Sequence, residues 1–166
     1  MAAGSTYTPI ATTTLGSAAS SFTFSSISGS YTDLVLVATM QRTGSPANCL
    51  VRVNGDSGSN YSNTFLYGDG SAAGSGRSSN QTQMQMDSRS FPPASGFNNM
   101  IANFQNYSNA TTYKTVISRS NEASGGVEAF VNLWRNTAAI TSIEVRIGSG
   151  NFAIGSTFTL YGIAAA

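Results

Sequence analysis

Short runs in which apolar and polar residues alternate recur along the whole chain, whereas the periodicity of helices is nearly absent. Residues 82–87 (TQMQMD) alternate strictly and place Met84 and Met86 on one face. Residues 31–40 (YTDLVLVATM) are more continuously apolar, which favours a central strand buried on both faces. We expect strands at residues 21–27, 31–40, 50–53, 63–67, 82–87, 100–104, 112–119, 126–134, 140–147 and 157–163.

The expected strand at residues 126–134 carries two interleaved patterns. Every second residue from 127 to 133 is apolar, and these four share one face: Val127, Ala129, Val131 and Leu133. Trp134 is out of phase with them and falls on the face of Phe130 and Asn132. We therefore expect Trp134 to lie outside the main core or at the end of its strand.

Turn-forming residues separate these runs. Glycine, asparagine and aspartate at residues 54–56, 68–70, 125–126 and 148–150 suit positive φ angles. Residues 71–80 (SAAGSGRSSN) are of low complexity and predict an exposed, mobile loop. Residues 91–97 (FPPASGF) predict a second long connection, because paired prolines exclude a central strand.

Strands of this length and spacing are typical of an all-β fold. We expect a single antiparallel β-sandwich of eight or more strands, with a jelly roll as the simplest arrangement. The sandwich domain is expected to cover residues 16–166. Residues 1–15 are rich in threonine and poor in core signals, so they predict an extended N-terminal arm.

Composition and charge narrow the possible functions. Charged residues make up only 9% of the 166 residues, and the net charge is +1. The basic residues are scattered, whereas nucleic acids and anionic membrane surfaces require clustered cations, so neither is an expected partner. No apolar run approaches the ~20 residues that span a bilayer. The first residues lack the features of a secretory signal, so we expect folding in a cytoplasm.

Catalytic side chains are scarce. The chain has no histidine, which removes the commonest general base and the usual zinc ligand. Cys49 is the only cysteine and shares a face with Val51 and Val53, so we expect a buried, inert thiol and no internal disulfide. The seven acidic residues show no paired arrangement in the sequence. We therefore expect no enzyme activity, no cofactor and no metal site.

Residues 54–60 (NGDSGSN), with Asp69 nearby, offer oxygen ligands of the kind that Ca²⁺ prefers. Their spacing does not match an EF-hand loop, so a turn held by aspartate and asparagine hydrogen bonds is the favoured interpretation. Aromatic residues could instead stack on sugars or pack at interfaces. The candidate partner-contact residues are Tyr7, Pro9, Tyr61, Tyr67, Arg77 and Trp134.

Several short sequence segments resemble those of a family of small virion structural proteins of tailed bacteriophages, especially phages of marine and cyanobacterial hosts. They lie at residues 14–16 (TLG), 24–27 (FSSI), 31–36 (YTDLVL), 54–62 (NGDSGSNYS), 114–115 (KT), 133–135 (LWR) and 156–163 (STFTLYGI). The resemblance implies a β-sandwich module that serves as a head-decoration protein or as the end domain of a tail fibre. It implies no catalytic residues.

The chain contains no coiled-coil or shaft segment, so we expect a free-standing decoration or cement protein. Its expected partner is the major capsid protein, its expected state a homotrimer, and its expected location the virion. The alternative is a receptor-binding knob that recognises host surface glycan, with Tyr61, Tyr67 and Arg77 as candidate residues. A polysaccharide hydrolase is the third possibility, and the scattered carboxylates disfavour it.

Overall fold

The computed structural model describes residues 6–164, and within this range the regular structure is entirely β. The strands are β1 (Tyr7–Thr14), β2 (Ser21–Phe24), β3 (Asp33–Met40), β4 (Arg42–Thr43), β5 (Cys49–Val53), β6 (Tyr61–Gly68), β7 (Ala73–Gln81), β8 (Met84–Gln85), β9 (Asn98–Phe104), β10 (Lys114–Glu122), β11 (Gly126–Trp134), β12 (Ile143–Ile147), β13 (Asn151–Phe152) and β14 (Thr157–Ile163). Among the described residues, no helix is long and apolar enough to cross a membrane.

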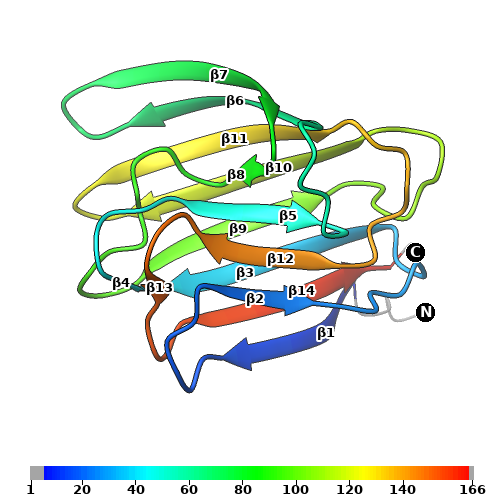
Figure 1. Ribbon diagram of the computed structural model, residues 1–166, viewed down its shortest axis with the longest axis horizontal. Helices are drawn as coiled ribbons and strands as arrows, with labels where there is room; N and C mark the ends of the chain where they lie inside the picture. The colour runs from blue at the N-terminus through cyan, green and yellow to red at the C-terminus, as the bar shows by residue number, and fades with distance from the viewer. Residues whose placement is uncertain (1–5, 165–166) are drawn as a thin grey trace.

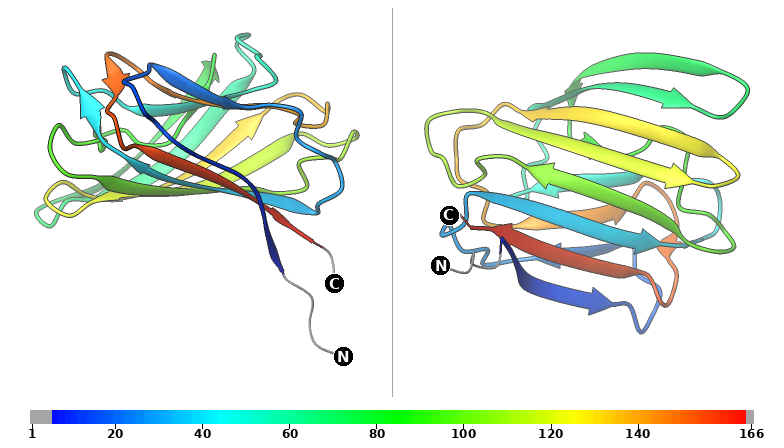
Figure 2. Two further views of the ribbon diagram at one scale, coloured as in Figure 1. Left: turned by 90° about the horizontal axis from the view of Figure 1, so that it is seen from below. Right: turned by 180° about the vertical axis from the view of Figure 1, so that it is seen from behind.

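The strands form two packed layers (Figures 1 and 2). The large sheet has the order β1-β14-β3-β9-β10-β11-β6-β7, and the small sheet has the order β2-β12-β5-β8. All pairings are antiparallel, and β4 pairs separately with β13. The expected antiparallel β-sandwich is therefore confirmed. The jelly-roll topology is not, since the strands divide unequally between the sheets.

The core lies between the two sheets and is built from alternate residues of each strand. In β3, which is a central strand as expected, Leu34, Leu36 and Ala38 are fully buried on the inner side. In β5 the buried residues are Cys49, Val51 and Val53, which confirms that the thiol is buried. Burying a side chain of the size of leucine or valine stabilises the fold by about 1.5–3 kcal/mol, so this interface between the sheets dominates folding.

Residues 71–80, expected to be a mobile loop, are instead largely β7, an edge strand of the large sheet. Their side chains bury almost nothing, so the hydrophobic pattern carries no signal there. The strand exists because its backbone pairs with β6, with Ala73 opposite Gly68 and Ser78 opposite Asn63. The second expected connection, residues 91–97, does lie outside the strands.

The expected N-terminal arm is only partly described, because residues 1–5 lie outside the described range. From Tyr7 the chain is extended, as expected, but it belongs to the sandwich as the edge strand β1. The β1 strand pairs with β14, and the Thr12 and Thr14 hydroxyls bond to those of Thr159 and Thr157. Leu15 is buried in the core, so residue 15 is not a structural boundary.

Candidate functional site

The outer face of β6, β10 and β11 carries an exposed apolar surface. Leu66, Val127 and Val131 are 59%, 58% and 50% exposed, and Ile117 is 38% exposed. Water-exposed apolar side chains of this kind are ordinary when they are scattered, but a contiguous group marks an interaction site. We call Leu66, Ile117, Val127, Ala129 and Val131 the apolar patch.

The strand register makes the apolar patch continuous. Ile117 on β10 lies directly opposite Val131 on β11, and Leu66 on β6 lies directly opposite Ala129. Directly opposed residues of antiparallel strands have Cβ atoms about 4.5–5.5 Å apart, so these side chains contact one another. A shallow hollow of about 240 Å³ opens among them, and its lining includes Thr64 of β6.

The rim of the apolar patch is polar. A second hollow of about 410 Å³ adjoins it on the same face and is lined mainly by Asn99, Ile101, Arg119, Asn121 and Val127. Arg119 is exposed, and so are Asn99 and Asn121. An apolar centre within a polar rim is the composition of a protein–protein interface.

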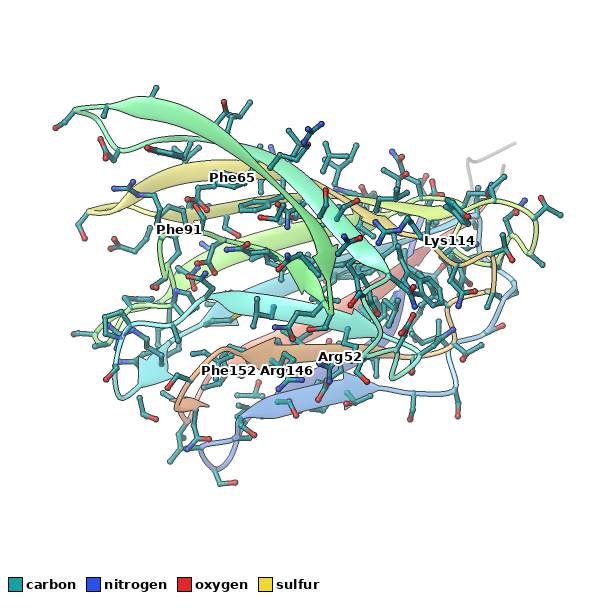
Figure 3. All side chains as sticks on the ribbon, turned by 45° about the horizontal axis from the view of Figure 1, so that its top comes forward. Arg52, Phe65, Phe91, Lys114, Arg146 and Phe152 are labelled. Atoms are coloured by element: carbon teal, nitrogen blue, oxygen red, sulfur yellow. The ribbon has the colours of Figure 1, made fainter. Side chains whose placement is uncertain are left out.

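Val127 and Val131 point outward. The alternation in β11 predicted the reverse, with their face toward the core and the face of Phe130 and Trp134 outside it. The inner face carries Glu128, Phe130, Asn132 and Trp134. The polar ones all find partners inside. Glu128 accepts hydrogen bonds from Ser88, and Asn132 exchanges two with the Gln85 backbone. The Phe130 ring stacks on Phe65 of β6, labelled in Figure 3, with centroids 4.8 Å apart.

The structure separates the six candidate partner-contact residues. Tyr61 and Trp134 are fully buried, so their expected role at a surface is wrong. Tyr67 lies under the Arg89 guanidinium, 4.8 Å from its ring centroid, and Arg77 is exposed on β7. The remaining two are on β1 at the opposite edge of the sheet. There Tyr7 meets the Tyr161 ring edge-on, and Pro9 is exposed.

The residues of the possible calcium loop form a turn at the corner where β6 begins and β11 ends. The Asp56 carboxylate accepts hydrogen bonds from the Gly58 N–H, the Asn60 amide and the Trp134 indole N–H. Burial raises the pKa of Asp56, but these hydrogen bonds outweigh it and hold the pKa below its usual value. Within residues 6–164, no three cysteine, aspartate or glutamate side chains are grouped so as to hold a metal ion.

Tyr61 and Lys114, which belong to the short sequence segments described above, lie at the same corner. The Tyr61 hydroxyl donates to the Asp56 carbonyl over 2.9 Å, and burial raises its pKa to about 12. The Lys114 ammonium, labelled in Figure 3, donates to the Thr112 and Thr137 carbonyls, and desolvation lowers its pKa. Tyr61, Lys114 and Trp134 are therefore buried parts of a structural corner of the fold.

Two buried carboxylates lie between the sheets, and the sequence did not indicate them. Asp87 accepts hydrogen bonds from the Cys49 and Phe91 N–H groups, and Glu128 accepts from the Ser88 N–H and hydroxyl. Both side chains are 0% exposed, so a substrate does not reach them in this structure. Burial raises the pKa of Asp87 to about 7, and the negative charge of Glu128 adds to this effect. The pair fixes the segment after β8 between the two layers.

The apolar patch is therefore a candidate interaction surface, and no sequence pattern indicated that it is exposed. Its apolar residues were visible in the alternation of β11, but the sequence does not say which of the two faces is covered. No protein-family model and no curated protein matches the chain.

Proposed function

We propose that the protein is a non-enzymatic structural protein of a phage virion, a decoration or cement protein that attaches to the outer capsid surface through its apolar patch. The observation that carries the proposal is the contiguous outward exposure of Leu66, Val127 and Val131 on a rigid sheet. The resemblance of the short sequence segments to virion proteins supports the identity of the partner, the major capsid protein.

The physical character of the patch suits assembly in many copies. Burying apolar area contributes about 25 cal/mol per Å², so a patch of this kind supplies attachment that does not depend on charge. With a net charge of only +1, the protein contributes little electrostatic steering. Copies that are joined in an oligomer bind the particle through several weak contacts at once, and these contacts add through avidity, which suits a cement protein that joins neighbouring capsomers. The oligomeric state expected of such a decoration protein is a homotrimer.

The proposal is tested by counting copies on purified phage particles by quantitative mass spectrometry. Hundreds of copies per particle are expected for a decoration protein, whereas tens at most would indicate a tail fibre instead. Absence from particles would contradict any role in the virion.

The attachment surface is tested with Val131→Lys, which places a charge within the apolar patch, directly opposite Ile117. We expect this variant to fold normally and to lose most of its binding to undecorated capsids in a cosedimentation assay. The control is Ser17→Lys, which adds the same charge at an exposed loop position away from the patch. Equal binding by both variants would show that another surface attaches the protein.

The alternative of a glycan-binding knob is weakened by one observation. Tyr61, one of its three candidate residues, is fully buried and bonded to the Asp56 carbonyl, so it offers no stacking surface. Saturable binding of the purified protein to host lipopolysaccharide would nevertheless favour the knob over the capsid.

A further inference from the structure

The two edges of the eight-stranded sheet differ in their capacity to accept another strand. The β1 edge carries Pro9, and its register is interrupted by a bulge between Pro9 and Ala11. The Ala164 N–H donates to the Thr6 carbonyl, and hydrogen-bonded pairs alternate along an antiparallel ladder. The nitrogen of Pro9 therefore faces away from β14, where it offers no donor to an incoming strand. Proline and bulges are the usual protection of a sheet edge.

The β7 edge lacks this protection. From Ala73 to Ser78 it pairs with β6 in unbroken register, and it contains no proline. The Asp69 N–H donates to the Ala72 carbonyl at the start of the ladder. By the same alternation, the backbone groups of Ala73, Ser75 and Arg77 point away from β6. They form a row of donors and acceptors on the open edge.

The side chains of β7 leave room for a neighbour. Gly74 and Gly76 have no side chain, and the Tyr67 and Phe65 rings lie over them on the inner face. On the outer face Ser75 is small, and Arg77 is the only charged residue of the strand. These small side chains leave the edge open to a second backbone at the ordinary strand spacing of about 4.8 Å.

We propose that β7 pairs with β7 of a second copy of this chain, antiparallel and about a two-fold axis. A strand that pairs with its own copy must avoid placing like charges opposite each other. With Ser75 opposite the second Ser75, Arg77 of each copy lies opposite Ala73 of the other. The one register that opposes the two arginines, centred on Arg77, runs into the irregularity between Ser78 and Gln81. The edge is thus self-complementary in a defined register.

This pairing has a consequence for the shape of the assembly. A two-fold axis between paired edges runs perpendicular to the sheet, so the outer faces of both copies lie on the same side. The two apolar patches then face one partner surface together. The pairing itself does not depend on that partner, so it can be tested on the purified protein alone. A two-fold dimer differs in symmetry from the expected homotrimer, so sedimentation of the purified chain distinguishes the two states.

The test is sedimentation velocity of the purified chain and of two Ser75 variants. An edge contact of this size is small, so we expect a weak dimer, with a dissociation constant between about 1 μM and 1 mM. Ser75→Pro removes an outward N–H without breaking a bond to β6, and we expect it to raise the dissociation constant at least about tenfold. The matched control Ser75→Thr keeps the N–H and should dimerise like the wild type.

A second variant tests the same contact without introducing proline, which could disturb the fold of β7. Ser75→Lys keeps the backbone donor but opposes two like charges in the proposed register, and it should also dissociate the dimer. Circular dichroism and thermal unfolding would verify that each variant is folded. A wild-type chain that stays monomeric at about 1 mM would overturn the proposal. So would a dimer or trimer that both folded variants, Ser75→Pro and Ser75→Lys, leave unchanged.

Discussion

The indole N–H of Trp134 donates a hydrogen bond of 2.7 Å to the carboxylate of Asp56, which lies 78 residues earlier in the chain. The bond joins the end of β11 to the turn that precedes β6. The Trp134 ring also stacks on Tyr61, with centroids 6.5 Å apart. The partner of the single tryptophan is thus a turn inside the same domain, and the contact belongs to folding.

Trp134→Phe keeps an aromatic ring at this corner but removes the donor. A hydrogen bond to a charged group contributes about 1.5–3 kcal/mol, so we expect the free energy of unfolding at neutral pH to fall by at least about 1.5 kcal/mol. The folded-state pKa of Asp56 lies below its unfolded value, so its contribution is present above the unfolded pKa and is lost as pH falls through the folded one. Urea unfolding followed by circular dichroism measures both effects. Tyr113→Phe, at an exposed tyrosine, serves as the control.

We expect the buried carboxyl of Asp87 to make the free energy of unfolding decline as pH rises. Its folded pKa of about 7 lies above the ordinary aspartate value of 3.8, so folding favours the protonated form. The contribution of Asp87 to the free energy of unfolding should therefore be complete below the unfolded pKa and should be lost, up to about 4 kcal/mol, as pH rises to the folded pKa. Chemical denaturation at a series of pH values measures this slope. A stability that is flat across this window would contradict the prediction.

Glu128→Gln tests the source of that slope. Glutamine keeps an acceptor for the Ser88 N–H and can donate to the Ser88 hydroxyl, so the hydrogen bonds survive. Removing the negative charge should lower the pKa of Asp87 and make stability less dependent on pH. The slope will not vanish, because burial is the larger cause of the raised pKa. An unchanged slope would mean that the two carboxylates do not interact.

Neighbouring glycines at the turn between β10 and β11 should respond differently to alanine. Gly126 has a φ of 127°, and a Cβ there would collide with the Gly68 carbonyl oxygen. We expect Gly126→Ala to lower the free energy of unfolding by more than about 2 kcal/mol. At Gly125 the obstructing atom is the end of the flexible Glu122 side chain, so Gly125→Ala should cost less than about 1 kcal/mol. Thermal unfolding of the Gly126→Ala and Gly125→Ala variants measures both changes. Equal losses of unfolding free energy in the two variants would contradict the prediction.

Attachment through the apolar patch should depend only weakly on salt. Exposed charges are screened within about 10 Å at 0.1 M ionic strength, whereas apolar burial is not weakened by salt. We therefore expect the binding of the protein to undecorated capsids to change less than about threefold between about 0.05 and 0.5 M sodium chloride. A steep loss over this range would indicate that charged residues such as Arg119, rather than Val131 and its neighbours, carry the contact.

Much of the fold could be predicted from local patterns. The bounds of β11 and the central place of β3 follow from residues adjacent in sequence, because alternation and apolar runs report directly on strands. The burial of Cys49 followed in the same way from its position in phase with Val51 and Val53. The candidate site did not follow. Two of the six expected contact residues, Tyr61 and Trp134, are buried, and the alternation in residues 126–134 predicts the core on the face of Val127 and Val131, which is exposed.

The sequence by itself determined that the chain is all-β, where most strands lie, and that catalytic side chains are few. Only the tertiary structure decided which face of β11 is covered, because Glu128, Asn132 and Trp134 become satisfied inside by partners about 40 or more residues away. The same holds for β7, whose glycine- and serine-rich residues become a strand through backbone pairing with β6. Backbone hydrogen bonds and distant polar partners leave no trace in hydrophobic periodicity, whereas side-chain burial does.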